Sequence, residues 1–523
     1  MFTLAQQRLS RLINSGHSAL LKQCIVGLEK ESLRVTHDGH LAQTAHPVAL
    51  GSALTHPYIT TDYSEALLEF ITPPRNNIAE LLQFLHETHL FTYTKIGDEM
   101  LWTTSMPCVV SGEQQIPIAR YGSSNQGMMK TIYRRGLGHR YGRPMQIIAG
   151  AHFNFSFADA FWPCYQASEK ATQPLQEFIS SSYFSLIRNV RRYSWLILYL
   201  FGASPAVCKS FLQGRESGLD EFDSHTLFGP YATSLRMGDI GYTNELAADM
   251  GVSACYNSLP SYVESLITAT TTSYPAYEKI GVVTNGEYRQ LNTNILQIEN
   301  EYYSSIRPKQ LLQENEKPAR ALQRRGVKYV ELRALDINMR EPLGINESQL
   351  RFLHAFMAFC QLDDSPTIDS DECREIDANF KRVAHEGRKP GLQLAQNGRT
   401  RDLKRWGLEL CAAMQGICEV LDSDEPGTPY QDTLAQQQAL FRDAGLTPSA
   451  IMLDEMRTNN EAFFHYGLRL SQQHRNHFAA QTLSAASRGY FEDEARRSLQ
   501  HQQRIEADDE VPFATHLQRY FNG

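Results

Sequence analysis

Strict alternation of polar and apolar residues in several short segments constrains the fold of this chain more than any other feature. In residues 151–157, the polar side chains of His152, Asn154 and Ser156 alternate with four apolar ones. Successive side chains of a β-strand point to opposite faces of its sheet, so such a segment has one polar and one apolar face. Residues 329–334 follow the same pattern. Strands of this kind are typical of an antiparallel sheet with helices packed behind it.

Helical periodicity marks the segments between and after these strands. Apolar residues recur at helical spacing over 175–190 and again after Asn346, where Asn346 and Gln349 have the spacing of a capping box. A shorter amphipathic helix is expected over the first fifteen residues, ending at Gly16. We therefore predict an α+β protein, with one catalytic unit over residues 1–400 and a helical C-terminal portion over 401–523 packed on the same fold.

Composition and charge exclude several classes of protein. The net charge of −8 over 523 residues argues against nucleic acid as a main partner. The longest nearly uncharged apolar stretch, 193–208, is sixteen residues long, whereas a membrane-spanning helix needs ~20, and it contains Gly202 and Pro205. The N-terminus lacks the basic start and apolar core of a secretory signal. We therefore expect a cytoplasmic protein without a membrane segment.

The distribution of cysteines also favours a cytoplasmic protein. All nine are scattered along the chain, and no two form a CxxC pair. This pattern indicates reduced thiols in the cytosol rather than a disulfide framework or a zinc site.

Acidic residues gather on the polar faces of the predicted strands. Glu29, Glu31, Glu69, Glu331 and the imidazole of His152 come from four separate segments, and Asp62 precedes the Glu69 segment. Taken singly, each of these side chains would most often meet only water. Together, the carboxylates repel one another unless cations compensate them. Carboxylates with a single imidazole suit Mg²⁺ or Mn²⁺ better than zinc.

An arginine accompanies this acidic group. Arg333 shares a predicted strand face with Glu331. Mg²⁺ ions bridge phosphate oxygens, and an arginine stabilises a phosphoryl group in transfer. The combination indicates chemistry on a nucleotide phosphate.

Other nucleotide and metal motifs fail on inspection. Residues 281–286 have the glycine spacing of a P-loop but continue with Glu287 and Tyr288 instead of Lys and Ser or Thr. Gly136 and Gly138 lack the third glycine of a dinucleotide-binding turn. The pair His86 and His89 is one residue short of zinc-protease spacing.

Longer strings of the sequence resemble the glutamate–cysteine ligase (γ-glutamylcysteine synthetase) family of the proteobacterial type. They are GLEKESLR at 27–34, GSALTH at 51–56, ITTDY at 59–63, EALLEFITP at 65–73, FGASPA at 201–206, YATSLR at 231–236, GYTN at 241–244, LQIENE at 296–301 and IRPK at 306–309. The similarity is nearly continuous from residue 27 to 386–391. It implies a glutamine-synthetase-like fold, in which a curved antiparallel sheet forms a funnel with metal ions on its inner face.

The resemblance also implies a reaction and a set of site residues. The reaction converts ATP, L-glutamate and L-cysteine to γ-L-glutamyl-L-cysteine, ADP and phosphate through γ-glutamyl phosphate, as the first step of glutathione biosynthesis. The implied metal ligands are Glu29, Glu31, Asp62, Glu69, His152 and Glu331. The implied catalytic arginine, which contacts the transferred phosphate, is Arg333. The implied pocket for cysteine consists of Tyr133, Leu137, Gln146, Arg236, Tyr242 and Tyr303. We expect a monomer that uses Mg²⁺, or Mn²⁺ in its place, and that is inhibited by glutathione.

Two alternatives stay open at this point. One is another carboxylate–amine ligase with a different amine acceptor, and the other is a metal-binding regulatory or scaffold protein without turnover. Read without the resemblance, Arg236 would be an ordinary surface ion pair, and Leu137 and the tyrosines would be packing residues. The adenine pocket and the general base for the cysteine amine are not assigned.

Overall fold

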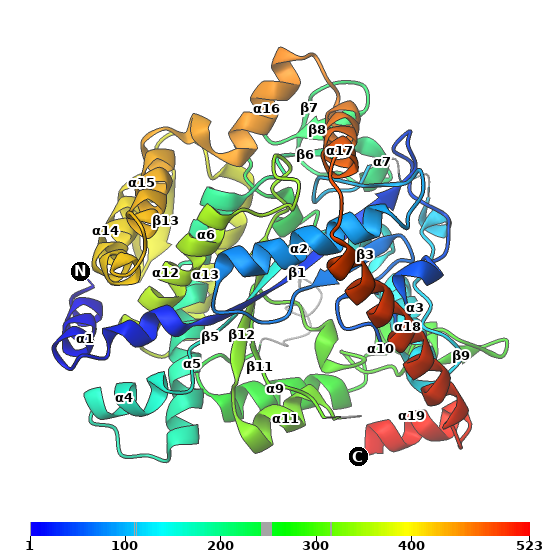
Figure 1. Ribbon diagram of the computed structural model, residues 1–523, viewed down its shortest axis with the longest axis horizontal. Coiled ribbons are helices and arrows are strands. Elements are labelled where there is room, and N and C mark those ends of the chain that lie inside the picture. Colours follow the sequence, from blue (N-terminus) through cyan, green and yellow to red (C-terminus); the bar gives the residue numbers. More distant parts are fainter. Residues whose placement is uncertain (1, 109, 111, 242–253, 314–315, 523) are drawn as a thin grey trace.

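A seven-stranded antiparallel sheet forms the centre of the protein (Figure 1). The computed structural model describes residues 2–108, 110, 112–241, 254–313 and 316–522. The strands of the sheet are β1 (Ile25–Val35), β2 (Ile59–Thr61), β3 (Leu67–Ile71), β4 (Met100–Leu101), β5 (Ala151–Ser156), β11 (Ile306–Lys309) and β12 (Tyr329–Leu335). Their order is β11-β12-β5-β1-β3-β2, with β4 paired to the end of β1. The predicted mixed architecture with an antiparallel sheet is confirmed.

Helices surround this sheet. Those that precede residue 400 are α1 (Thr3–Asn14), α2 (Ile78–Tyr93), α3 (Asn125–Tyr141), α4 (Phe161–Ser168), α5 (Leu175–Arg192), α6 (Ser194–Phe201), α7 (Lys209–Leu212), α9 (Leu259–Thr271), α10 (Pro275–Ile280), α11 (Pro318–Arg325), α12 (Glu347–Leu362) and α13 (Ser370–Glu386). The predicted capping box of α12 is present, because Asn346 and Gln349 each accept a hydrogen bond from the other's backbone N–H. The helices expected at the N-terminus and over 175–190 correspond to α1 and α5.

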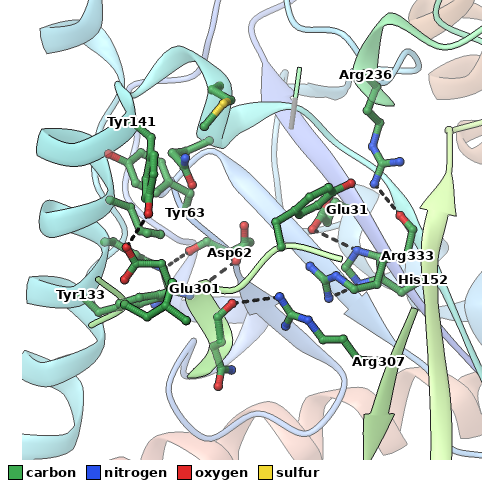
Figure 2. Close-up of a pocket in the computed structure, with 17 residues that line it drawn as sticks. Glu31, Asp62, Tyr63, Tyr133, Tyr141, His152, Arg236, Glu301, Arg307 and Arg333 are labelled. Carbon is green, nitrogen blue, oxygen red and sulfur yellow. Dashed lines mark hydrogen bonds and ion pairs between the residues drawn. The ribbon is translucent and has the colours of Figure 1, made fainter. Parts of the chain in front are cut away.

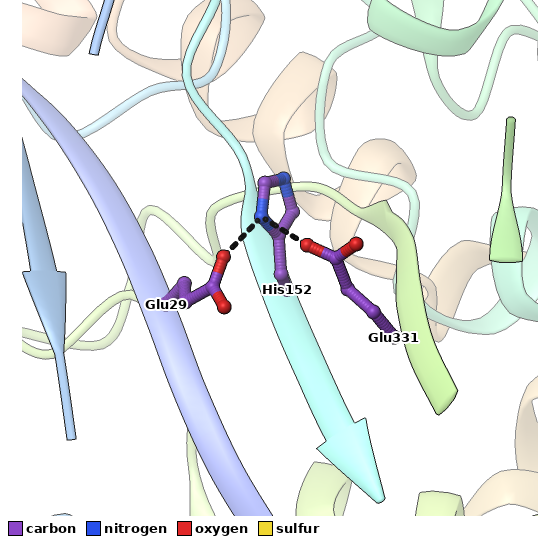
Figure 3. A group of neighbouring side chains, drawn as sticks. All are labelled: Glu29, His152 and Glu331. Atoms are coloured by element: carbon purple, nitrogen blue, oxygen red, sulfur yellow. Dashed lines mark hydrogen bonds and ion pairs between the residues drawn. The ribbon is translucent and has the colours of Figure 1, made fainter. Parts of the chain in front are cut away.

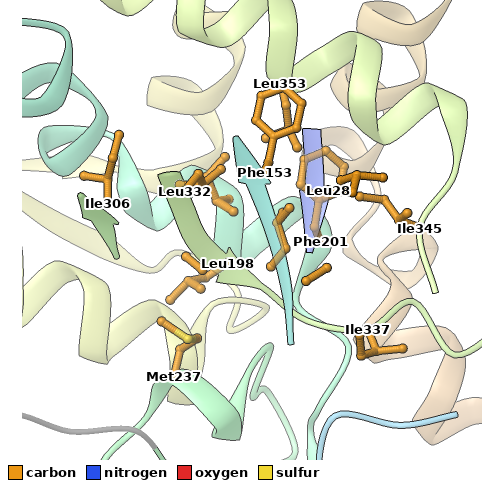
Figure 4. Packing of buried hydrophobic residues seen from close by; sticks show 14 of the residues in the cluster. Leu28, Phe153, Leu198, Phe201, Met237, Ile306, Leu332, Ile337, Ile345 and Leu353 are labelled. Atoms are coloured by element: carbon orange, nitrogen blue, oxygen red, sulfur yellow. The ribbon is translucent and has the colours of Figure 1, made fainter. Parts of the chain in front are cut away.

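The apolar face of the sheet is the core of the protein. Leu28, Phe153 and Leu332 are aligned across β1, β5 and β12 by the strand register. Figure 4 shows this row between Leu353 of α12 and residues of α6. Each of the three side chains is at most 1% exposed. Burial of such a side chain contributes about 1.5–3 kcal/mol, so this register is strongly specified.

The same register fixes the opposite, polar face. Glu29 lies beside His152, and Glu31 lies beside Glu69. A slip of one residue would turn Leu28 toward the polar face and Glu29 into the core. The packing of the core therefore sets the position of the acidic side chains.

Three small sheets and a set of C-terminal helices complete the molecule. The small sheets contain β6 (Ala206–Cys208), β7 (Asp220–Glu221) and β8 (Thr226–Phe228); β9 (Val283–Thr284) and β10 (Glu287–Tyr288); and β13 (Gln393–Gln396) and β14 (Arg399–Asp402). The C-terminal helices are α14 (Leu403–Asp422), α15 (Pro429–Arg442), α16 (Pro448–Thr458), α17 (Phe463–Ala479), α18 (Ala485–Ala507) and α19 (Phe513–Asn522). Helices α17 and α18 pack on α2, and α19 packs on α3. The predicted helical character of the C-terminal portion is confirmed, whereas the division at residue 400 stays a prediction.

One expectation about the cysteines is wrong. Cys108 and Cys208 form a disulfide with a Cα–Cα distance of 5.5 Å. They are 100 residues apart in the sequence, and the fold brings the loop after β4 against the end of β6. Sequence spacing carries no signal for such a pair, so scattered cysteines are no argument against a disulfide.

The apolar stretch 193–208 is buried in the core of the protein. It forms α6 and β6, and Gly202 ends the helix between them. Within the described part of the chain, no helix combines the length and the apolar character that a membrane span requires.

Candidate active site

A cluster of two carboxylates and one imidazole lies on the polar face of the sheet (Figure 3). Nδ1 of His152 is 3.1 Å from Oε2 of Glu29 and 3.6 Å from Oε1 of Glu331. One ligand atom from each residue falls within 4.8 Å of the others. Strands β1, β5 and β12 contribute one residue each, so the rigid sheet holds the cluster. Oxygen donors with a single imidazole fit a divalent cation such as Mg²⁺ or Mn²⁺.

The other three predicted metal ligands lie beside this cluster. Oε1 of Glu31 is 3.9 Å from Nε2 of His152. Glu69 is the register partner of Glu31, and Asp62 lines the same cavity as Glu31. Burial raises the pKa of Glu69 well above its usual value, and the charges of Glu29, Asp62 and Glu31 raise it further. A bound cation would relieve this repulsion, so the donor set fits a second metal ion.

Positive side chains surround Glu331. Burial opposes ionisation of this carboxyl, yet its pKa lies well below the usual value because Arg333, Lys309 and His152 are close. Arg333 donates a hydrogen bond of 2.7 Å to Oε1 of Glu331, and Nζ of Lys309 lies 2.9 Å from Oε2. Glu331 therefore holds the guanidinium of Arg333 at the edge of the cluster of Glu29, His152 and Glu331.

A cavity of about 120 Å³ opens beside the cluster (Figure 2). Its walls include every described residue of the predicted cysteine pocket, namely Tyr133, Leu137, Gln146, Arg236 and Tyr303. Glu31, Asp62, His152 and Arg333 line the same cavity. Tyr242, the sixth predicted pocket residue, lies outside the described residues. The structure thus brings the predicted acceptor residues, part of the predicted metal set and the predicted arginine into one site.

Arg236 is a buried residue, so reading it as a surface ion pair is wrong. It belongs to the 3₁₀ turn Leu235–Met237 and is 1% exposed. Its Nη2 donates to the carbonyl oxygen of Arg333 at 3.0 Å, and its Nη1 is 3.7 Å from Oδ1 of Asp336. Gly150 makes room for the guanidinium, because a Cβ at that position would lie 2.0 Å from Nη2.

Asp336 is held from several sides. Ser204 and Ser234 donate their hydroxyl hydrogens to its two oxygens at 2.6 and 2.9 Å, and the backbone N–H of Ala203 donates at 2.8 Å. Burial raises the pKa of Asp336, and Arg236 and these hydrogen bonds oppose the rise. Arg236 and these three donors favour the ionised carboxylate and hold Asp336 in place beside the guanidinium.

Several lining residues were not predicted from the sequence. Arg134 donates to the backbone oxygen of Asp62, and Glu301 accepts from Arg140 and from the hydroxyl of Tyr141, both at 2.9 Å. Arg307 lines the cavity as well. It is the register partner of Glu331 across β11 and β12. The alternation in the IRPK string was a usable signal for Arg307, whereas Arg134 and Glu301 lie on a helix and a 3₁₀ turn, where no strand pattern points to them.

Comparison with known proteins identifies the family of the chain. The profile of the glutamate–cysteine ligase family matches residues 9–383. Glutamate–cysteine ligase from Alcanivorax borkumensis is 49% identical over 522 residues, which cover 99% of each chain. The corresponding ligase from Pseudomonas putida is 50% identical over 509 residues, which cover 97% of this chain and 96% of the relative.

Two solved structures have a fold similar to that of this chain. The crystal structure of glutamate–cysteine ligase from Francisella tularensis in complex with AMP has a TM-score of 0.89 at 35% identity and covers 96% of this chain and 98% of its own. A bifunctional glutathione synthetase from Pasteurella multocida shares the fold, with a TM-score of 0.73 at 23% identity over 95% of this chain and 58% of its own. With a family profile that spans most of the sequence and relatives that match it from end to end, the chain belongs to the glutamate–cysteine ligase family.

Proposed function

We propose that the chain is an ATP-dependent glutamate–cysteine ligase, which makes γ-L-glutamyl-L-cysteine, ADP and phosphate in the first step of glutathione biosynthesis. The observation that carries this proposal is that the acidic cluster and the cavity adjoin each other. Arg333 lies between the acidic cluster at Glu331 and the cavity that contains Arg236. The AMP complex of the Francisella relative supports a nucleotide substrate.

The proposed mechanism follows from the weakness of a carboxylate as an electrophile. Transfer of the γ-phosphoryl group of ATP to the glutamate γ-carboxylate releases ADP and gives γ-glutamyl phosphate. The α-amine of cysteine then attacks the acyl carbon, phosphate leaves, and the amine loses a proton. Arg333 would donate hydrogen bonds to the phosphoryl oxygens, because its guanidinium is fixed at the junction of the cluster and the cavity.

The acidic residues would hold two Mg²⁺ ions. Glu29, His152 and Glu331 would hold one, and Glu31, Asp62 and Glu69 the other. When bound, these ions would neutralise phosphate oxygens and allow ATP and a carboxylate to approach each other. The sheet, and not a loop, carries most of these ligands, which favours a preorganised site.

The cavity beside Arg333 suits a small acceptor. Its volume of about 120 Å³ is well below the ~300–1,000 Å³ typical of pockets for drug-sized ligands. Arg236 would pair with the α-carboxylate of cysteine through two parallel N–H groups. Tyr133, Leu137, Gln146 and Tyr303 would form the walls around the rest of the molecule.

Finer properties are proposed on the same family grounds. The sheet would have the curvature of a glutamine-synthetase-like funnel, with residues 1–400 as the catalytic unit and 401–523 packed on it. The enzyme would act as a cytoplasmic monomer, prefer Mg²⁺ but accept Mn²⁺, and be subject to feedback inhibition by glutathione.

Mass spectrometry of the products formed from ATP, glutamate and cysteine tests the proposal directly. We expect γ-glutamylcysteine with one ADP and one phosphate per peptide, and no product in EDTA. Formation of AMP and pyrophosphate would overturn the acyl-phosphate mechanism. Faster turnover with an acceptor other than cysteine would identify a different carboxylate–amine ligase, and a failure to turn over any acceptor would indicate a scaffold protein.

A further inference from the structure

A second, larger cavity lies on the other side of α3 from the active site. Its volume is about 910 Å³, which is the size of a small-molecule site. One wall is the face of α3 that carries Arg135 and His139, and the opposite wall is the hairpin of β9 and β10, with Arg289 after it. Figure 1 shows α3 and β9 on the same side of the molecule. Tyr133, Leu137 and Tyr141 of the same helix line the active-site cavity instead, so α3 separates the two cavities.

The second cavity is basic, although the protein as a whole is acidic. Its lining contains four arginines, Arg120, Arg135, Arg143 and Arg289, against two glutamates, Glu65 and Glu287. The net charge of the chain is −8. A concave surface of one sign focuses the electrostatic field and attracts ligands of the opposite sign.

The pKa of His139, which lines the cavity, responds to these positive charges. Partial burial lowers the pKa of His139, and the guanidinium groups of Arg289, Arg143 and Arg135 lower it further. Glu113 is the nearby carboxylate that opposes the decrease. At His139 the effect of the three arginines thus outweighs that of Glu113.

Two of the four arginines bind backbone oxygens of the cavity wall, and the other two do not. Arg135 donates to the carbonyl oxygen of Tyr288 at 2.5 Å, and Arg143 donates to the carbonyl oxygen of Ile116 at 3.1 Å. These two contacts fix the walls, and neither guanidinium forms an ion pair with a carboxylate among the described residues. In the described part of the chain, the guanidinium groups of Arg120 and Arg289 form no hydrogen bond or ion pair.

Glu65, one of the two acidic residues on the cavity wall, already has both of its carboxylate oxygens occupied by hydrogen bonds. The two oxygens of Glu65 accept hydrogen bonds of 2.7 Å from the backbone N–H groups of His46 and Arg120. Glu65 thus fixes the backbone of Arg120 and leaves its side chain to extend from the wall. We propose that this cavity is a binding site for a small anion with several negative charges, either a phosphate ester or a polycarboxylate, held by Arg120 and Arg289 from opposite walls.

Isothermal titration calorimetry with the full-length protein in Mg²⁺-containing buffer tests this site. Fructose 1,6-bisphosphate serves as the phosphate-ester probe and tricarballylate as the polycarboxylate probe, so the two experiments distinguish the two sources of charge. The test variant is Arg120→Glu/Arg289→Glu, because neither guanidinium has a hydrogen-bond or ion-pair partner among the residues that the structure describes. The matched control is Arg399→Glu/Arg504→Glu, which makes the same change in net charge at β14 and α18, away from the cavity lining.

We expect one probe or both to bind at one site per chain, and to bind the control variant equally well. The cavity variant should bind about 100-fold or more weakly, since it loses two charge-assisted contacts and gains two repulsive charges. Its ligase activity and melting temperature should match those of the parent, because neither arginine lines the active site. Binding of the same strength to parent and cavity variant, non-saturating binding, or no binding of either probe would each overturn the proposal. The heat of binding is measured without glutamate, cysteine or ATP, so the outcome does not depend on the proposed ligase activity.

Discussion

Replacement of Arg236 by alanine tests the acceptor site most directly, because it has two separable consequences. The first concerns stability. The charges of Arg236 and Asp336 are 3.7 Å apart, which corresponds to roughly 4–5 kcal/mol at an effective dielectric constant of ~20. Removal of one member of a buried ion pair costs about 3–5 kcal/mol, since the other charge is left buried. We therefore expect the free energy of unfolding to fall by about 3–5 kcal/mol.

The second consequence concerns the substrate. If Arg236 binds the cysteine carboxylate, Arg236→Ala should lose about 2–5 kcal/mol of acceptor binding. This equals about 30- to 4,000-fold in kcat/KM for cysteine. The constants for glutamate and ATP should change far less, because both substrates are proposed to bind at the metal cluster.

Two measurements separate these effects. Urea unfolding gives the stability, and the ratio of kcat/KM for cysteine to that for cysteamine, which lacks the carboxylate, gives the specificity. The parent should strongly prefer cysteine, and the variant should not. In Arg236→Ala/Asp336→Asn, the buried charge is gone, so part of the stability should return while the preference for cysteine stays lost. An unchanged cysteine-to-cysteamine ratio in Arg236→Ala would refute the assignment.

Further predictions concern the acidic cluster, Arg333 and the buried His354. Glu29→Gln and Glu331→Gln should each abolish turnover without unfolding the protein, because an amide lacks the charge that holds Mg²⁺; near-normal initial rates at ordinary Mg²⁺ would contradict this. Arg333→Lys should lower kcat strongly with little effect on the KM for cysteine, since loss of such an arginine costs ~10³–10⁵ in rate and lysine recovers only part; a change confined to KM would place it in the acceptor site. Burial lowers the pKa of His354 to about 4 from an ordinary 6.5, so the unfolded chain takes up the proton first as the pH falls. Stability should therefore decrease between pH 6.5 and 4, by about 2 kcal/mol from pH 7 to 5 for this group, and urea unfolding of His354→Gln should show a weaker pH dependence than the parent.

Much of the sheet and of its acidic face was predictable, because both follow from the alternation of polar and apolar residues along the strands. The alternation in β5 and β12 identified which residues share a face, and the structure places His152 and Glu331 on the same face as Glu29. Alternation cannot specify which strands become neighbours, so it could not show that β1 lies between β5 and β3. That order is fixed by long-range packing.

The features that were missed depend on contacts between distant segments. Asp336 acquires its role only because the loop after α6 and the turn at Ser234 surround it. The burial of Arg236 depends on the absence of a side chain at Gly150. The Cys108–Cys208 disulfide likewise joins segments that no local pattern relates. Such contacts are properties of the assembled fold and have no signature within one segment.

The position of β1 in the sheet has a consequence for synthesis of the chain. This first strand ends up between β3 and β5, so its second edge is covered only when β5, which ends at Ser156, has been made. At ~5–20 residues per second, the interval between residues 35 and 156 lasts roughly 6–24 s. During that time β1 is an unfinished strand edge, and such edges associate with other chains unless charged side chains oppose it. Glu29, Lys30 and Glu31 place three consecutive charges at its middle. The carboxylates proposed as metal ligands in the finished enzyme would thus also oppose aggregation of the growing chain before β5 pairs with β1.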